Sequence, residues 1–438
     1  MMRMKKDWEK IIDILHDEVV PATGCTEPVS LAFAAAVAAS KLQEPVVRIQ
    51  ARVSPNLMKN GMGVMVPGTG RPGLYIAAAV GALGGNPNAD LQVLEGITQD
   101  HVNKAIDMVE QQLVSVDIAY DVPYVLYAEA VLIGKAHCVK VCISDRHTNV
   151  IYIEKDGNVL FQKSADDTND KENKEAFLQS LTINKIIDFA EQVPIEAIQF
   201  IAEAGDMNET LSQVGLAGKY GLQIGATLMK QQQSGLMGTD LQSNVIIRTV
   251  GASDARMGGA KLPAMTNSGS GNQGISATMP VVVVADYVHA TTEERLRAMV
   301  LSHVTAIYAH AFLPKLSALC AAMTACIGAA VGMAWLLSKK HERSVICNAI
   351  CNMTGDLSGM ICDGAANSCS MKVASASAAA FKAVLLAMEG IRVSGHDGVV
   401  AFDVDECIRN IGILATSGMK QTDEEILHIM LNKNKMKV

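Results

Sequence analysis

The sequence predicts an α+β fold, in which a mainly helical domain, discontinuous along the chain, carries a smaller inserted α+β domain. Two observations predict this class. Alternation of apolar and polar residues, the pattern of half-buried strands, is confined to residues 46–172, whereas helical spacing of apolar residues dominates on both sides. Aromatic residues make up only 4% of the chain, against 35 glycines and 23 methionines, and such small or flexible side chains favour closely packed helices over a sandwich of sheets.

The first segment, residues 1–45, predicts two helices joined by a turn. Trp8–Glu18 places its apolar residues on one helical face. Pro21–Pro28 interrupts the helical pattern, and an alanine-rich helix then runs to about Leu42. We expect residues 1–45 to pack back onto residues 176–438, so that the helical domain is built from two separate stretches of sequence.

Residues 46–172 predict the inserted α+β domain. Asp156-Gly157 lies between two alternating runs and is a strong signal for a two-residue hairpin turn. His101–Val114 carries an apolar stripe with helical spacing. The polar, charged stretch Lys163–Glu175 lacks periodicity and is expected to be the exit linker. The segments expected to be strands are Val47–Val53, Val139–Ile143, Asn149–Ile153 and Asn158–Gln162.

The remaining residues, 176–438, predict the main helical domain. The short apolar run Pro280–Asp286 fits either a buried strand or the start of a helix. The uncharged stretch Leu316–Ser338 is long enough to span a bilayer, but its many Ala, Gly, Ser, Thr and Cys residues favour a buried core helix. Two segments have the spacing of capping boxes that open helices, namely Thr291-x-x-Glu294 and Thr422-x-x-Glu425.

The 438 residues include 37 Lys and Arg against 45 Asp and Glu, which gives a formal net charge of −8. This balance argues against a basic nucleic-acid-binding surface and against a polybasic membrane patch, so neither nucleic acid nor membrane is an expected partner. No uncharged segment typical of a signal peptide follows the first residues. Ten cysteines without such a signal favour the cytoplasm, where thiols stay reduced and grouped cysteines more often bind metal or do chemistry.

Three cysteines in the C-terminal half, Cys320, Cys362 and Cys369, are candidate metal ligands. The last two bracket a turn-like segment between helical stretches. Three thiolates presented from loops or helix ends can hold an iron–sulfur cluster, and an iron without a protein ligand is a Lewis acid open to a substrate. Because no CxxC pair occurs, the alternative of small buried cysteines in an alanine-rich core stays open.

Cys25 is a candidate catalytic residue. It lies in a turn bounded by Pro and Gly just before a helix, and a helix N-terminus stabilises a thiolate. A cysteine that merely belongs to a helix-capping loop is the alternative. Among the ten histidines, His147 and His396 lie in expected loops and are weaker acid–base candidates.

The segment Asn267–Gly274 is dense in glycine, hydroxyl and amide groups. Successive free N–H groups in such a loop form an anion-binding nest, so a substrate carboxylate would fit there. A flexible surface turn is the alternative. Arg71 is a weaker candidate, from its loop position only. The side chains expected to contact a ligand are Asn267, Ser268, Ser270, Asn272 and Gln273.

A second glycine-rich loop, Gly68–Gly73, has the formal pattern GxGxxG of a dinucleotide site. Glu95 follows at a spacing where a ribose-binding acid would lie. The apolar run before the loop is very short, however, and the α+β segment lacks the alternating strand–helix units of a doubly wound sheet. A dinucleotide site is therefore the less favoured alternative.

Three motifs occur together in this chain, namely Pro21-Ala-Thr-Gly-Cys-Thr-Glu-Pro28, Gly269-Ser-Gly-Asn-Gln-Gly274 and Gly359-Met-Ile-Cys-Asp-Gly364 with Cys369 behind it. In combination they resemble the L-cysteine desulfidase family, which is related to the alpha part of iron–sulfur L-serine dehydratases. The resemblance covers essentially the whole chain. Gly-Cys-Thr-Glu-Pro together with Ile-Cys-Asp-Gly is its most specific part.

The resemblance implies an oxygen-sensitive [4Fe–4S] cluster held by Cys320, Cys362 and Cys369 in a catalytic helical domain. It also implies that Cys25 is the catalytic base and that pyridoxal phosphate (PLP) takes no part. The implied reaction is α,β-elimination, in which L-cysteine loses sulfide to give aminoacrylate, which hydrolyses to pyruvate and ammonia. The expected partner is a small amino-acid substrate, and the small-residue helices suit a homodimer.

Two alternatives to this function stay open. L-Serine also has a leaving atom on Cβ and carries the same carboxylate and ammonium groups as L-cysteine. L-Serine dehydratase activity therefore fits the same residues. A non-enzymatic iron–sulfur or thiol sensor would use the same cysteines, although a sensor needs no carboxylate nest. The chain departs from the serine dehydratases in the shorter spacing of Cys362 and Cys369. It also ends on Lys433–Val438 without a cysteine, so their tail-to-cluster contact is not carried over.

Overall fold

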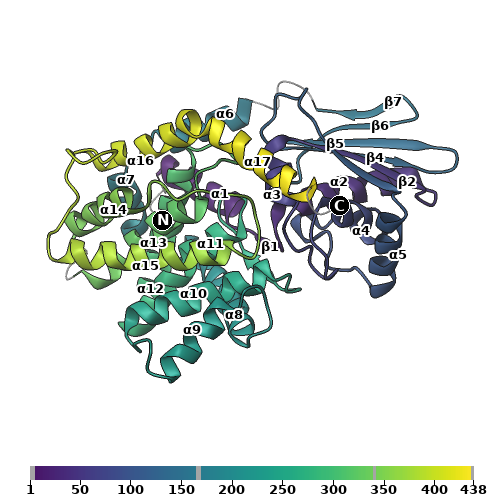
Figure 1. Ribbon diagram of the computed structural model, residues 1–438. Helices are drawn as coiled ribbons and strands as arrows, with labels where there is room; N and C mark the ends of the chain where they lie inside the picture. Colours follow the sequence, from purple (N-terminus) through teal and green to yellow (C-terminus); the bar gives the residue numbers. More distant parts are fainter. Residues whose placement is uncertain (1–4, 164–168, 339–341, 436–438) are drawn as a thin grey trace.

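The computed structural model describes residues 5–163, 169–338 and 342–435. It confirms an α+β protein with two parts that lie side by side in Figure 1. The sheet part is formed by residues 26–162, and the helical part by residues 6–18 and 169–413. The last helix, α17 (Lys420–Lys435), runs from the helical part to the sheet part and packs on α3 (Pro55–Gly61).

The sheet part contains the strands β2 (Arg48–Val53), β3 (Val114–Ile118), β4 (Tyr127–Ile133), β5 (Cys138–Ser144), β6 (Val150–Lys155) and β7 (Asn158–Gln162). They form one sheet in the order β3-β2-β4-β5-β6-β7, in which only β2 and β3 run parallel. The predicted hairpin is confirmed, because Asp156 and Gly157 have φ angles of 53° and 81° between β6 and β7. Both left-handed conformations suit the twist of a two-residue turn.

Two helices, α2 (Thr26–Leu42) and α4 (Leu74–Gly84), pack against the sheet, and α5 (Gln99–Glu110) packs on α4. Nearly every residue of α2 is buried, as expected for a helix that is apolar on all sides. The expectation that residues 1–45 pack on the helical part therefore holds only for α1 (Lys6–Glu18), whose apolar face joins the helical core. The chain passes into the sheet part before α2, because α2 covers the sheet.

The helical part surrounds a large apolar core. Its centre is α13, which packs against four other helices, α11, α12, α14 and α15. The bounds are α6 (Asn169–Gln179), α7 (Ile183–Gln192), α8 (Ala202–Leu216), α9 (Ile224–Gln233), α10 (Leu241–Met257), α11 (Gly271–Tyr287), α12 (Thr292–His310), α13 (Ala321–Leu337), α14 (Arg343–Leu357), α15 (Cys369–Met388) and α16 (Val404–Ile413), with 3₁₀ turns at Asp90–Gln92, Ile195–Ala197 and Gln199–Ile201 and a π-helical turn at Leu414–Gly418.

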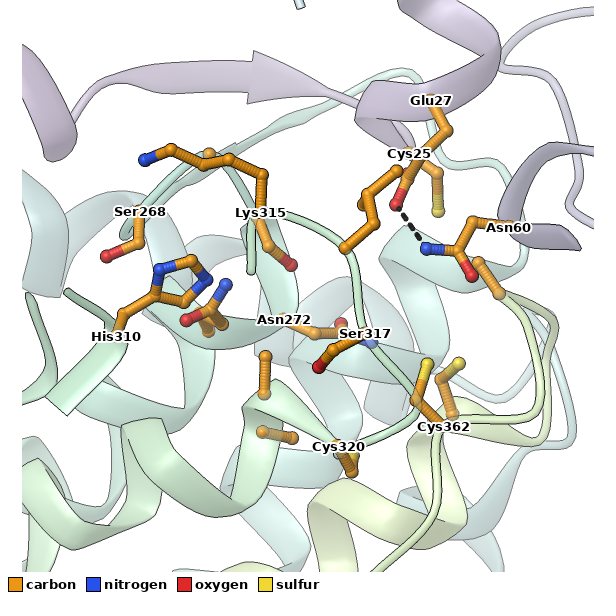
Figure 2. A pocket seen from close by; sticks show the side chains of 18 of the residues that line it. Cys25, Glu27, Asn60, Ser268, Asn272, His310, Lys315, Ser317, Cys320 and Cys362 are labelled. Carbon is orange, nitrogen blue, oxygen red and sulfur yellow. Dashed lines mark hydrogen bonds between the residues drawn. The ribbon is translucent and has the colours of Figure 1, made fainter. Parts of the chain in front are cut away.

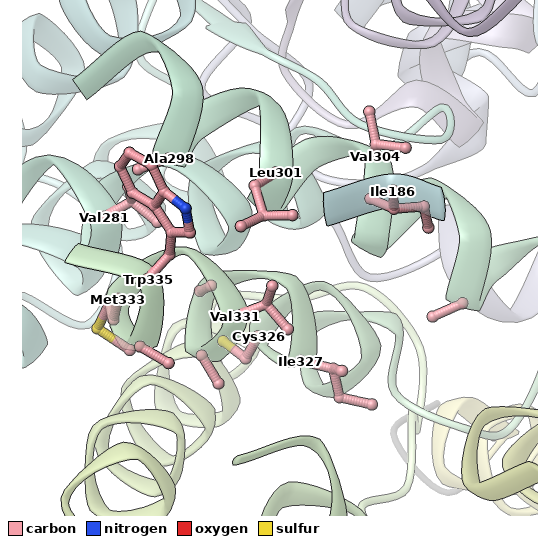
Figure 3. Packing of buried hydrophobic residues seen from close by; sticks show 14 of the residues in the cluster. Ile186, Val281, Ala298, Leu301, Val304, Cys326, Ile327, Val331, Met333 and Trp335 are labelled. Carbon is pink, nitrogen blue, oxygen red and sulfur yellow. The ribbon is translucent and has the colours of Figure 1, made fainter. Parts of the chain in front are cut away.

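Small residues let α12 and α13 approach closely. Figure 3 shows Val331 and Trp335 of α13 facing Ala298 and Leu301 of α12. A Cβ atom added at Gly328 of α13 would lie 2.2 Å from a backbone oxygen of α12, so only glycine fits there. Such contacts explain how a chain with few aromatic side chains still fills its core. Small residues let the helix backbones come close together, so large side chains are not needed to fill the space between them.

The uncharged stretch Leu316–Ser338 forms a buried core helix, as the sequence predicts, although α13 begins only at Ala321. Ala322–Trp335 is buried without interruption. Within the described ranges, α15 is the one helix that is long and apolar enough to cross a membrane by length and composition. Half of that stretch is buried inside the protein, and core helices meet the same criteria.

Three predicted features of the helical part fall in α11, α12 and α17. Pro280–Asp286 lies inside α11, a helix buried on every side, so its apolar run is helical and not a strand. The Thr291 capping box is confirmed. The Thr422 capping box is wrong, because α17 already begins at Lys420 and leaves Thr422 inside the first turn.

The expected linker Lys163–Glu175 is largely helix. From Asn169 onward the chain forms α6, whose Lys174 makes ion pairs with Asp17 and Glu18 at the end of α1. Lys174 is largely covered in these ion pairs, and Leu178 in the last turn of α6 joins the helical core. Residues 164–168 lie outside the described ranges.

A two-stranded ladder joins the turn before α2 to the loop before α11. β1 (Pro21–Thr23) pairs antiparallel with β8 (Pro263–Met265), with Ala22 opposite Ala264. The sequence gives no alternating pattern for either three-residue strand. The ladder brings the segment that contains Cys25 beside the glycine-rich loop, although more than 200 residues separate them in sequence.

Candidate active site

A cavity of about 110 Å³, lined by both polar and apolar side chains, lies where the helical part meets the sheet part (Figure 2). Ser268, His310 and Lys315 lie at one end, and Cys320 and Cys362 at the other. The cavity brings together most of the residues that sequence reasoning selected. Those that line it are Cys25, Cys320, Cys362, Cys369, Ser268, Ser270, Asn272, Gln273 and His147.

An adjoining cavity of about 420 Å³ shares part of this lining. The shared residues are His147, Ser268, Gly269 and Lys315. The adjoining cavity is bounded on one side by the end of α1 and on the other by the loop between β5 and β6. It lies along the boundary between the two parts of the protein.

Four long helices begin at the cavity. Their first residues or caps line it or lie beside it: Cys25 caps α2, Ser270 caps α11, Cys320 caps α13 and Ser368 caps α15. Each helix N-terminus presents free N–H groups and about half a unit of positive charge. The cavity therefore favours anionic groups, whether thiolates or a carboxylate.

Backbone pairing places Cys320 and Cys362 side by side. Leu319 and Ile361 form an antiparallel bridge, the amide of Cys320 donates to Met360 O at 2.9 Å, and the amide of Cys362 donates to Ala318 O at 2.7 Å. Cys369 begins α15 and packs beside Cys25, Val64 and Met257. Three separate segments thus supply the three thiols that the sequence analysis grouped.

Burial raises the pKa of the Cys320 thiol to about 12 and that of Cys369 to about 11, and neighbouring sulfur atoms add to both shifts. The thiol form dominates at neutral pH, and only strong positive charge among the sulfurs would turn them into thiolates. Within the described ranges, no three His, Cys, Asp or Glu side chains converge closely enough for one metal ion. The donor set fits a cluster better, because each iron of a cluster takes its own cysteine.

Cys25 is held at the N-terminus of α2 by the β1–β8 ladder and by Gly24, whose φ of 78° reverses the chain. It is 1% exposed, and its Sγ donates to Met257 Sδ at 3.6 Å. Burial raises the pKa of Cys25 to about 12, and the guanidinium of Arg256 opposes the shift. The helix N-terminus predicted from sequence is present, but burial outweighs it in this environment.

The glycine-rich segment is less open than its composition predicts. Asn267 and Ser270 pair to form a tight turn through Ser268 and Gly269, which have φ angles of 50° and 80°. From Gly271 the chain is helical, so Asn272 and Gln273 belong to the first turn of α11. Their side chains still line the cavity, and Gln273 Oε1 is buried without a hydrogen-bond partner among the described residues.

Asn267 does not line the cavity. Its Nδ2 lies 3.0 Å from His303 Nδ1 and also donates to the carbonyl of His303 at 3.2 Å. His303 Nε2 lies 3.0 Å from the hydroxyl of Thr278, which donates to Gly274 O at 2.7 Å. These buried hydrogen bonds hold the turn on the side away from the cavity, so Asn267 positions the loop. Its placement does not support the prediction that it contacts a ligand.

Two other candidates lie elsewhere. Arg71 is exposed and does not line the cavity, and His396 is an exposed residue edge-on to Phe402. The Gly68–Gly73 loop connects α3 to α4, whereas a dinucleotide fingerprint needs a preceding strand in a parallel sheet. The sheet is mainly antiparallel, so its topology does not support the dinucleotide alternative.

Sequence reasoning missed six polar residues of the cavity, namely Glu27, Asn60, Arg256, His310, Lys315 and Ser317. Arg256 ends α10, His310 ends α12, and Glu27 lies in the first turn of α2. Arg256 and His310 are both 4% exposed, and burial lowers the pKa of His310 to about 4. For His310 the available signal was its place after residues 298–309, a run without Asp, Glu, Lys or Arg, whereas Arg256 follows Arg248 and Asp254 and has no such signal in the sequence.

A cavity between two parts of a protein that contains grouped thiols, helix N-termini and unpaired polar groups is typical of an enzyme active site. The chain belongs to the serine dehydratase alpha chain family, whose sequence model matches residues 88–428. A UPF0597 protein of Chromobacterium violaceum is 53% identical over 97% of this chain and 98% of its own length. The UPF0597 protein YhaM of Escherichia coli K12 is 52% identical over 97% and 98%, and one from Actinobacillus pleuropneumoniae serotype 3 is 51% identical over 99% and 100%.

Proposed function

We propose that this protein is an iron–sulfur-dependent, PLP-independent lyase that eliminates the β-substituent of a small amino acid, with L-cysteine as its substrate. The overall reaction converts L-cysteine and water into pyruvate, ammonia and sulfide. One observation carries the proposal: three grouped thiols, Cys25 and the turn at Ser268 line one small cavity. Membership of the serine dehydratase alpha chain family supports elimination chemistry on an amino acid.

Cys320, Cys362 and Cys369 would hold a [4Fe–4S] cluster. When bound, such a cluster supplies an iron without a protein ligand, a Lewis acid for the leaving sulfur or oxygen atom. The chain contributes the fixed geometry of its thiols and nearby positive charge. The ammonium of Lys372, paired with Asp363, lies close enough to lower the pKa of both the Cys320 and the Cys369 thiols.

The two ends of an amino-acid substrate find complementary groups in the cavity. The hydroxyl groups of Ser268 and Ser270, with the free N–H groups that open α11, suit the carboxylate. The carboxylate of Glu27, held by Asn60 Nδ2 at 3.3 Å, and the unpartnered Oε1 of Gln273 suit the ammonium. A substrate bound between these groups is oriented by both charged ends, which restricts Cα and Cβ to one side of the cavity.

Cys25 is the proposed base that takes the proton from Cα. With a pKa of about 12 it is a thiol at rest, so its thiolate requires proton transfer to another group or a rise in local positive charge. His310 and His147 line the same cavity, and burial lowers the pKa of both imidazoles. A lowered pKa makes each ring a weaker proton acceptor, so formation of the Cys25 thiolate depends mainly on positive charge brought close to it, such as the ammonium of a bound substrate.

The cytoplasm is the proposed location. All ten cysteines are free thiols in this structure, which supports a compartment where thiols stay reduced. L-Serine remains the alternative substrate, because the groups that meet the carboxylate and ammonium are the same. The leaving atom on Cβ is the only difference between the two amino acids.

The test begins with protein purified without oxygen. Iron and acid-labile sulfide near four each per chain, followed by pyruvate release from L-cysteine faster than from L-serine, is the expected result. Faster turnover of L-serine would correct the substrate while keeping the reaction class. A folded protein that contains neither iron nor labile sulfide would contradict the proposal as a whole.

A further inference from the structure

Arg256 is a buried cation without a carboxylate partner among the residues that the structure describes. It is 4% exposed. Its Nε donates to the carbonyl of Gly24 at 3.1 Å, and its Nη1 donates to Met257 Sδ at 3.3 Å. A guanidinium has five N–H donors, so these two contacts leave most of its capacity unused. Arginines are almost never buried to this extent unless an anion pairs with them.

The surroundings of Arg256 make the absence of an acidic side chain more costly. A Cβ atom added at Gly271 would lie 2.2 Å from Arg256 Nε, so the guanidinium packs directly on the first residue of α11. Its other neighbour, Gly24, immediately precedes the cap of α2. Both helix N-termini carry partial positive charge and repel a cation, whereas the C-terminal end of α10, on which Arg256 stands, favours one. An anion at this point would be stabilised by the arginine and by two helix ends at once.

The sulfur of Met257 shows how close Arg256 lies to the proposed base. Three donors meet this atom: Arg256 Nη1 at 3.3 Å, Asn272 Nδ2 at 3.3 Å and Cys25 Sγ at 3.6 Å. All three donor residues line the cavity. A small anion that contacts the free edge of the guanidinium therefore lies in the same part of the cavity as the Cys25 sulfur.

We infer that Arg256 binds the α-carboxylate of the substrate, together with the N–H groups that open α11. The inference rests on the proposed function and deepens it, because it restricts the substrates to amino acids with a free carboxylate. A guanidinium edge and a carboxylate form two parallel charge-assisted hydrogen bonds. Cα is bonded directly to the carboxylate carbon, so this anchor holds the α-proton beside Cys25.

The first test measures binding without turnover. L-Alanine has no leaving group on Cβ, so calorimetry with anaerobic, iron-loaded protein reports binding alone. Wild-type protein should bind L-alanine and discriminate against L-alaninamide, whereas Arg256→Gln should bind L-alanine roughly 10- to 100-fold more weakly. Arg71→Gln, an exposed arginine outside the cavity, is the matched control and should bind like wild type. Unchanged L-alanine affinity in Arg256→Gln overturns the inference.

The second test separates a carboxylate anchor from a partner of the cluster thiolates. In Arg256→Gln, kcat/KM for L-cysteine should fall by the same roughly 10- to 100-fold, while kcat/KM for L-cysteinamide stays near its wild-type value. Iron content and the visible spectrum should not change. Loss of iron in the variant would assign Arg256 to the cluster and overturn the inference. Arg256-dependent binding of L-alanine without any elimination activity would refute the lyase and leave the carboxylate site standing.

Folding of the variants provides the remaining control. Because the guanidinium is buried without an acidic partner, Arg256→Gln should unfold thermally within a few degrees of wild type when no ligand is added. Arg256→Lys keeps the charge but lacks the bidentate edge, so its affinity for L-alanine should be intermediate. A large fall in thermal stability of both variants would mark Arg256 as a structural residue and contradict its assignment to the substrate.

Discussion

Lys59 and Asp423 form an ion pair that joins the sheet part to the last helix, with Nζ of Lys59 2.5 Å from Oδ1 of Asp423. Lys59 lies on α3 and is 1% exposed. The same ammonium donates to the carbonyl oxygens of Ser317 and Cys362, each at 3.3 Å. One buried cation therefore fixes both loops that present the paired cysteines Cys320 and Cys362, and anchors α17 across them.

Lys59→Met should destabilise the protein and loosen the cysteine loops. The substitution leaves Asp423 and two carbonyl oxygens without their partner, a loss of about 2–4 kcal/mol in the free energy of unfolding. Denaturation in urea measures it. Lys382→Met, which removes an exposed pair with Asp356, is the matched control and should cost under about 1 kcal/mol. Equal effects of the two substitutions would show that burial of the Lys59 pair has no energetic consequence.

Serine in place of any one of Cys320, Cys362 and Cys369 should abolish or strongly reduce the iron content of anaerobically purified protein. A hydroxyl is a poor replacement for a thiolate that binds iron. Cys326→Ser is the control, because Cys326 is fully buried in α13 and does not line the cavity. Ser276 and Ser377 lie beside it and can hydrogen-bond to the new hydroxyl. Full iron content in Cys362→Ser would remove that residue from the cluster ligands.

Cys25→Ser should retain the iron and lose turnover. The serine hydroxyl occupies nearly the same place at the start of α2 but is far less acidic than a thiol, so it is a poor source of a base. Iron analysis and pyruvate release on the same sample separate the two effects. If iron were lost together with activity, Cys25 would be a fourth cluster ligand, and the base would have to be sought at His310 or His147.

The fold class was predictable because it leaves local signals, whereas the grouping of Cys320, Cys362 and Cys369 came from the motifs of the family resemblance and not from their spacing. Alternation marked β2, β5, β6 and β7, and Cys25 stands directly before a recognisable helix, but the start of α13 just after Cys320 was not predicted. The side of the molecule on which α2 packs was not predictable, since an apolar helix of small residues fits either the sheet or the helical core. The β1–β8 ladder was equally hidden, because three-residue strands such as Pro21–Thr23 and Pro263–Met265 have no period to detect.

Within the site, the sequence identified residues by their chemical type, but it did not show which way each side chain points. Asn267 and Asn272 look equivalent in the glycine-rich segment, yet one turns inward to His303 and the other lines the cavity. The difference arises because the segment becomes helix α11 at Gly271, which rotates successive side chains by about 100°. Arg256 was not predicted because the observation that singles it out is the lack of a carboxylate partner among the described residues. That lack is visible only in the three-dimensional packing.

The buried histidine behind the loop should make the protein sensitive to acid. Burial lowers the pKa of His303 from 6.5 to about 3, so between these values the unfolded chain binds a proton that the folded protein does not. The free energy of unfolding therefore falls as the pH decreases below 6.5, by roughly 1.4 kcal/mol per pH unit from this residue alone. Urea unfolding of wild type and His303→Gln from pH 7.5 to pH 4.5 measures the effect. The variant should show a slope shallower by that amount, with the exposed His396→Gln unchanged from wild type. Parallel slopes in all three proteins would mean that His303 is protonated in the folded protein and that its contacts with Asn267 and Thr278 differ from those described.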